Sequence, residues 1–198
     1  MRDIVIGVFE GPGVFPEPGS PRNVWPAAAD GTVPPLRSAA VLVPLIEHDG
    51  GMTVLLTRRT SSLSNHAGQI SFPGGTHAPC DASPEDTALR ETEEEIGVAR
   101  ERVELVGRMN ACDTGTGFRV VPVVGLLRPP VPLVPDPAEV DEVFEVPIDF
   151  VLDPANHRSE ERVHRGERRR FWVVPYEDRY IWGLTARILV ELSGLLRR

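Results

Sequence analysis

The stretch FPGGTHAPCDASPEDTALRETEEEIGV, from Phe72 to Val98, is the most informative part of this chain. It places four acids close together after a double glycine. The four acids are Glu91, Glu93, Glu94 and Glu95. Like charges one helical turn apart destabilise a helix by about 0.2–0.5 kcal/mol per pair. Such crowding therefore requires a structural or functional reason.

The second half of this stretch carries the signals of a helix. Ser83 can cap the start and Pro84 suits the first helical position. Gly97 suits the left-handed residue that follows a helix. The sequence therefore predicts a helix over residues 84–96.

Three acids of this helix share one side, opposite its apolar stripe: Glu91, Glu94 and Glu95. Runs of charge usually form a solvated surface, which is one interpretation. Converging carboxylates are also what Mg²⁺ and Mn²⁺ prefer, and a bound ion would remove the repulsion. The preceding Gly74 and Gly75 let the backbone approach a metal or a phosphate closely, which favours the second interpretation.

The composition excludes several classes of protein. With 198 residues, 41% hydrophobic and 25% charged, the chain is typical of one globular domain. Its formal net charge of −8 argues against sequence-independent nucleic-acid binding. Cys80 and Cys112 predict free thiols in a reducing compartment. The chain has no signal-peptide pattern and its apolar stretches are too short for a membrane span, so we expect a soluble, cytoplasmic protein.

Strand and helix patterns alternate after an N-terminal segment rich in Pro, Gly and Ala. We expect that segment, residues 1–36, to be a leader that wraps the surface or stays mobile. Residues 39–47 and 52–59 are β-branched runs joined by a glycine turn, which predicts a hairpin. Apolar spacing over residues 183–196 predicts a helix. We expect residues 37–198 to form one α/β domain, with a mixed sheet between helices.

The acidic helix carries a resemblance to a known family. Six residues match the R-E-U-x-E-E-x-G-U part of the Nudix box, where U is apolar: Arg90, Glu91, Glu94, Glu95, Gly97 and Val98. The chain therefore resembles Nudix hydrolases, which implies an α/β/α sandwich and hydrolysis of a nucleoside diphosphate linked to another group. Three departures exist, the first of which is Thr92 in place of an apolar residue. The spacing from Gly75 to Arg90 is one residue longer, and Ala82 stands where the box has its first glutamate, with Asp81 and Glu85 the nearest acids.

A second motif narrows the substrate class. The stretch LLTRRTSSLSNHAGQISFPGG, from Leu55 to Gly75, resembles the signature of the coenzyme A pyrophosphatase subgroup. Thr60 stands where that signature has Ser or Ala, and Ser64 stands where it has an arginine, whose fork of donors suits phosphate. The resemblance extends over about residues 37–190 and implies cleavage of coenzyme A to 3′,5′-ADP and 4′-phosphopantetheine.

The resemblance also implies a metal-dependent site with Mg²⁺ or Mn²⁺ as the cofactor. The expected metal ligands are Glu91, Glu94, Glu95 and the backbone of Gly74. The expected catalytic residues are Arg90, Glu94 and Glu139, the last as general base. The expected substrate contacts are Arg59, His66, Phe72 and Gly75. For Arg59, His66 and Glu139 the competing interpretation is a surface or locally packed side chain without such a role.

Several alternatives remain open at this point. The basic run over residues 164–170 offers charge for a 3′-phosphate, but an exposed hairpin whose arginines pair with Glu160, Glu161 and Glu167 is the favoured interpretation. The rival substrates are ADP-ribose, a dinucleotide or a nucleoside triphosphate. A catalytically silent module that binds a nucleotide is the rival of another class. We expect a small nucleotide-type partner and neither nucleic acid nor membrane, and a homodimer is left open.

Overall fold

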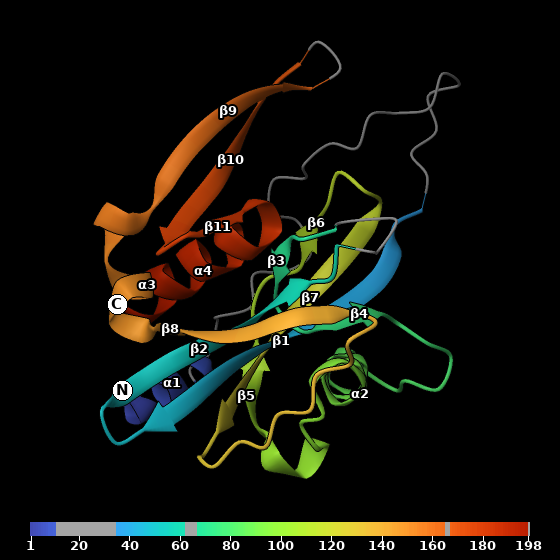
Figure 1. The fold of residues 1–198 in the computed structure, drawn as a ribbon, viewed down its shortest axis with the longest axis vertical. Helices are drawn as coiled ribbons and strands as arrows, with labels where there is room; N and C mark the ends of the chain where they lie inside the picture. The colour runs from blue at the N-terminus through green and yellow to red at the C-terminus, as the bar shows by residue number, and fades with distance from the viewer. Residues whose placement is uncertain (11–34, 62–66, 165–166, 198) are drawn as a thin grey trace.

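A mixed sheet of eight strands forms the centre of the domain (Figure 1). The computed structural model describes residues 1–10, 35–61, 67–164 and 167–197. The strands of this sheet are β1 Arg37–His48, β2 Gly51–Arg59, β3 Ile70–Ser71, β4 Gly74–Thr76, β5 Glu104–Arg108, β6 Cys112–Asp113, β7 Phe118–Leu127 and β8 Val140–Pro147. The helices are α1 Arg2–Glu10, α2 Pro84–Ile96, α3 Ile148–Leu152 and α4 Gly183–Leu196, with 3₁₀ turns at Arg100–Arg102 and Pro154–Asn156.

Strand β1 organises this sheet. It pairs in parallel with β7, from Arg37 opposite Phe118 to Ile46 opposite Leu127. It pairs antiparallel with β2 as the predicted hairpin, and with the short β4. The order along the main path is β3-β2-β1-β7-β5, and β8 lies against β2. Because one pairing is parallel and the others antiparallel, the sheet is mixed, as predicted.

The two faces of the sheet are covered by different helices. Successive residues of a strand point to opposite faces. On β1, Leu42 packs with Ala88 of α2, whereas its neighbour Val43 belongs to the core that contains Leu189 of α4. Figure 1 accordingly shows α2 on one side of the strands and α4 on the other. The predicted α/β/α arrangement is confirmed.

The first helix departs from the prediction for residues 1–36. Arg2–Glu10 forms α1, whose Val5 is fully buried and whose Phe9 is 6% exposed within the core on the α4 side. These residues are therefore part of the packed domain and not a leader outside it. Val5 and Phe9 are four residues apart and so share one helix face, but the Pro- and Gly-rich residues that follow hid this signal. The rest of the segment, residues 11–34, lies outside the described residues.

A second sheet of three antiparallel strands stands beside α4. Its strands are β9 Arg158–His164, β10 Glu167–Tyr176 and β11 Arg179–Trp182. Every residue of β9 whose exposure is described is exposed. Arg170 donates to Glu161 at 2.9 Å across the hairpin. This contact confirms the hairpin and one of the pairings that the exposed-hairpin interpretation predicts.

Both cysteines are free thiols, as predicted. Cys80 is exposed, whereas Cys112 is buried, and burial raises the pKa of the Cys112 thiol to about 11. Cys112 is therefore a neutral core side chain at neutral pH. Among the helices that the structure describes, each is too short or too polar to cross a membrane.

Candidate active site

Helix α2 begins and ends where its sequence predicts. The Ser83 hydroxyl accepts the Asp86 N–H at 3.2 Å, and Pro84 occupies the first turn. Gly97 adopts φ 72° and donates its N–H to Glu93 O at 3.0 Å. These caps fix the register of the helix, and so they fix which side its glutamates occupy.

The double glycine allows strand β4 to pass between β1 and α2. A Cβ atom at Gly74, where φ is 148°, would lie 2.4 Å from Ala40 O. A Cβ atom at Gly75 would lie 2.4 Å from the carboxylate carbon of Glu91. Glu91 therefore rests its carboxylate directly on the backbone of Gly75, an approach that a side chain there would prevent.

Glu95 is a buried carboxylate with few partners. Its side chain is 2% exposed. Gly74 N–H donates to its Oε2 at 3.1 Å, and Arg59 Nη1 donates to its Oε1 at 3.0 Å. Burial nevertheless raises the pKa of Glu95 to about 7, and the charges of Glu139 and Glu91 add to the rise. The two donors therefore do not fully offset the cost of burying the negative charge of this carboxylate.

Arg90 ties the loop before α2 to the acids of the helix. Its Nε and Nη2 donate to the two oxygens of Asp81 at 2.9 and 3.0 Å. Its Nη1 lies 3.0 Å from both Glu94 and Glu91 carboxylate oxygens, and Nη2 donates to Thr76 O at 3.1 Å. The Arg90 guanidinium is the main reason why the pKa of Asp81 lies well below its usual range.

Asp81 is thus a residue of the candidate site that the sequence motifs do not select. It was named only as an acid near the position where the Nudix box has its first glutamate. In the structure its side chain is 3% exposed and positions Arg90. The sequence signal for Asp81 is an acid one residue before the position of the missing glutamate. A loop can place a side chain at the same point in space after a shift of one residue.

The loop that carries Glu139 is anchored on the end of α2. Asp136 N–H donates to the backbone O of Glu95 at 2.9 Å, which satisfies one of the free carbonyls at the helix C-terminus. Thr60 N–H donates to Glu139 O at 2.9 Å, and Arg59 Nη2 lies 3.5 Å from Glu139 Oε2. The side chains of Glu139 and Glu95 therefore lie on either side of the same Arg59 guanidinium, although 44 positions separate them in the sequence.

One of the expected substrate contacts, Phe72, lies in the core. Phe72 is 3% exposed and belongs to the core on the α4 side of the sheet. Its side chain packs inside the domain, so it is not open to a ligand from solvent. His66 and Ser64 lie outside the described residues.

The acids suit a hard cation, although arginines hold them at present. Within the described ranges, no three side chains from His, Cys, Asp and Glu stand together as a ready metal site. Arg90 engages Glu91 and Glu94, and Arg59 engages Glu95. Burial raises the pKa of both Glu91 and Glu95, and neighbouring carboxylates add to each rise. Oxygen donors that repel one another are the set that Mg²⁺ or Mn²⁺ would hold together.

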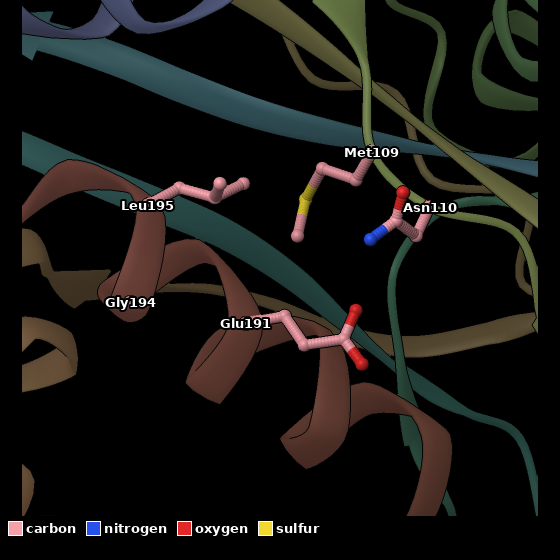
Figure 2. Close-up of a pocket in the computed structure, with 5 residues that line it drawn as sticks. All are labelled: Met109, Asn110, Glu191, Gly194 and Leu195. Carbon is pink, nitrogen blue, oxygen red and sulfur yellow. The ribbon is translucent and has the colours of Figure 1, made fainter. Parts of the chain in front are cut away.

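A cavity of about 260 Å³ lies away from these acids, between α4 and the connection from β5 to β6 (Figure 2). Its lining residues are Met109, Asn110, Glu191, Gly194 and Leu195. Figure 2 shows the side chains of Met109 and Asn110 facing α4. The predicted site residues that the structure describes are not in this lining, so the cavity is distinct from the candidate active site.

Comparisons with known proteins agree with this geometry. The family model described as NUDIX domain matches residues 35–165. The "Uncharacterized Nudix hydrolase NudL" of Photorhabdus laumondii subsp. laumondii is 41% identical over 157 residues, which cover 79% of this chain and 83% of that protein. The protein of the same name from Escherichia coli K12 is 40% identical over 157 residues, which cover 79% and 81%.

Solved structures show the same fold. The crystal structure of the Nudix hydrolase RenU from M. smegmatis aligns with a TM-score of 0.51 and 23% sequence identity. The alignment covers 66% of this chain and 83% of that one. At this level of identity the likeness supports the architecture alone.

Proposed function

The chain belongs to the Nudix hydrolase family, and from that premise we propose that it cleaves the pyrophosphate bond of coenzyme A or a derivative, releasing 3′,5′-ADP and 4′-phosphopantetheine. Family membership makes it a pyrophosphohydrolase that acts on a nucleoside diphosphate linked to another group. The stretch from Leu55 to Gly75 carries the step to coenzyme A, because it resembles the signature of that subgroup over most of its length.

Nudix enzymes generally use a divalent metal such as Mg²⁺ or Mn²⁺. In this chain Glu91, Glu94 and Glu95 would supply the carboxylate oxygens, and the backbone of Gly74 would supply a further ligand. When bound, such an ion neutralises phosphate oxygens and lowers the pKa of an attacking water. The support for this assignment is the grouping of these carboxylates beside the Gly74 backbone, together with burial and neighbouring charges that raise the pKa of Glu95 to about 7.

The remaining residues position these groups. Asp81 fixes Arg90 through two hydrogen bonds, and Arg90 in turn orients Glu91 and Glu94. Glu139 is the proposed general base, because its side chain is 43% exposed and stands at the edge of the acidic cluster. In-line attack on phosphorus depends mainly on such positioning and on charge stabilisation.

One observation favours a second candidate substrate. Ser64 replaces the arginine of the coenzyme A signature, and this removes a charge suited to phosphate. The alternative function is hydrolysis of ADP-ribose, a dinucleotide or a nucleoside triphosphate by the same acids.

A substrate panel tests the proposal. The full chain is incubated with coenzyme A, ADP-ribose, a dinucleotide and a nucleoside triphosphate, each with Mg²⁺ or Mn²⁺, and products are separated by chromatography. We expect the highest kcat/KM for coenzyme A, with 3′,5′-ADP as a product. A higher kcat/KM for another substrate selects the alternative, and binding without turnover indicates a catalytically silent module.

A further inference from the structure

We propose that Arg59 and the divalent cation are alternative partners of Glu95. Arg59 neutralises this carboxylate in the metal-free protein and gives it up when the cation binds. The inference rests on the proposed metal site and adds to it an internal competitor for one ligand.

The contacts of Glu95 leave little room for a further cation. Among the described residues, Arg59 is the one cation that forms an ion pair with Glu95, at 3.0 Å from Oε1. The other oxygen accepts Gly74 N–H at 3.1 Å. Both oxygens are thus engaged by donors, and the side chain is 2% exposed, so water cannot replace either donor freely.

A carboxylate buried to this extent needs positive charge in every state of the protein. Leaving a buried charge unpaired is strongly unfavourable. Two cations on one carboxylate oxygen repel each other, however, and the repulsion is stronger in a low-dielectric site than in water. Arg59 and the dication are therefore expected to exchange at Glu95, since the carboxylate cannot be left bare and cannot hold both well.

Arg59 has a place to go when it leaves Glu95. Its second terminal nitrogen, Nη2, already lies 3.5 Å from Glu139 Oε2. The Arg59 side chain is 24% exposed and that of Glu139 is 43% exposed, so this pair lies on the solvent side of the cluster. A small rotation would keep the pair with Glu139 and open Oε1 of Glu95.

The neighbouring arginine provides a matched control. Arg58 precedes Arg59 in β2 and has a different ion-pair partner. It pairs with Glu142 at 2.9 Å and is 34% exposed. Its removal deletes one arginine of the same strand without touching Glu95.

The test is Mn²⁺ binding to the metal-free full chain, measured by calorimetry at pH 8.5 to limit competition by protons. We expect Arg59→Met to lower the Tm of the metal-free protein, because Glu95 loses its counter-ion. We also expect it to tighten Mn²⁺ binding about tenfold, since no charge-assisted hydrogen bond must be broken. Arg58→Met is expected to leave the Mn²⁺ affinity within about twofold of the unmodified chain.

The result that overturns the proposal is an Mn²⁺ affinity that is unchanged or weaker in Arg59→Met. If that variant does not fold, Arg59→Lys replaces it, because lysine keeps the charge and loses the planar fork. A severalfold tighter Mn²⁺ affinity in Arg59→Lys then supports the exchange, and an equal or weaker affinity overturns it. Failure of the proposed function looks different: neither the unmodified chain nor the variant binds Mn²⁺, and the exchange then falls with it.

Discussion

The two ends of the acidic site contain carboxylates with similarly low solvent exposure whose pKa values move in opposite directions. Asp81, in the loop before α2, is 3% exposed and accepts hydrogen bonds from Arg90, the Thr87 hydroxyl and Ala78 N–H. Glu95, in the last turn of α2, is 2% exposed and accepts one backbone N–H and one guanidinium. The pKa of Asp81 is held well below its usual range, chiefly by Arg90, whereas burial raises that of Glu95 to about 7.

The difference lies in depth as well as in partners, since the hydrogen bond from Arg90 is the largest cause of the pKa shift at Asp81 and burial is the largest cause at Glu95. Donors arranged on all sides make the ionised form of Asp81 part of the framework. Glu95 has the burial without the full set of donors, and like charges stand near it. The donors around Asp81 stabilise the fold. The carboxylate of Glu95 is only partly neutralised, so a cationic ligand can bind to it.

The largest expected effect comes from removing the charge of Glu95. We expect Glu95→Gln to lower metal-dependent turnover by about a thousandfold or more, because a metal ligand contributes several kcal/mol to transition-state stabilisation. At pH 7 the unfolding free energy of the metal-free protein should fall by only about 1 kcal/mol, since the amide oxygen of glutamine can accept one of the two hydrogen bonds and no charge is buried. Steady-state kinetics and urea denaturation measure the two effects.

Glu93→Gln is the matched control, since Glu93 lies in the same helix and is exposed. It should retain turnover within about twofold. Comparable loss in both variants would mean that α2 needs its total charge and not one particular carboxylate.

The second largest effect should be a loss of stability when Asp81, at the other end of the site, is changed. We expect Asp81→Asn to lower the unfolding free energy by about 2–3 kcal/mol, because Arg90 loses the partner of two charge-assisted hydrogen bonds. Asp141→Asn, at an exposed position, should change it by less than about 0.5 kcal/mol. A stability loss smaller for Asp81→Asn than for Glu95→Gln would contradict the division of roles between the two ends.

The opposite pKa shifts predict opposite dependences of stability on pH. Between the ordinary Glu value of 4.5 and about 7, folded Glu95 retains a proton that the unfolded chain has released. Its contribution to the stability of the metal-free protein therefore falls as pH rises through this window, by on the order of 3 kcal/mol. For Asp81 the contribution is present above its ordinary value of 3.8 and is lost as pH falls below it.

Urea denaturation of the unmodified chain and of Glu95→Gln from pH 4.5 to 8 isolates the first term as a difference. The change of that difference with pH should become smaller when Mn²⁺ is added, since a cation takes the place of the proton. A difference that does not vary with pH would show that Glu95 titrates normally.

The smallest of these effects should come from the double glycine. A methyl group at Gly75 would lie 2.4 Å from the Glu91 carboxylate, which is the flexible end of a side chain and can move aside. We therefore expect Gly75→Ala to fold normally and to lose about tenfold in turnover through a displaced metal ligand. Gly50→Ala, where the added methyl meets open space, should lose nothing. Equal turnover in both variants would show that Glu91 is not a metal ligand.

Local signals in the sequence accounted for much of the site. Ser83, Pro84 and Gly97 specified the limits of α2, and the spacing of its acids specified their common side, because both depend on residues within one or two turns. The contacts that distinguish the two ends are tertiary. Arg59 meets Glu95 across 36 positions, and no periodicity in the sequence reports such a meeting.

The fold was predicted less evenly at its edges. Two apolar, β-branched runs joined by a glycine turn predicted β1 and β2, since strands buried on both faces are apolar almost without interruption. The composition of residues 1–36 as a whole does not indicate α1, although the spacing of Val5 and Phe9 is helical. Asp81 was passed over for a similar reason, since its role depends on a loop that no regular pattern describes.

The most direct test of the account is an anomalous difference map from crystals of the full chain grown with Mn²⁺. We expect a peak bound by the Glu91 and Glu95 carboxylates, with Arg59 no longer in contact with Glu95. A chain that crystallises in Mn²⁺ without a peak at these two carboxylates, with Arg59 still on Glu95, would contradict it.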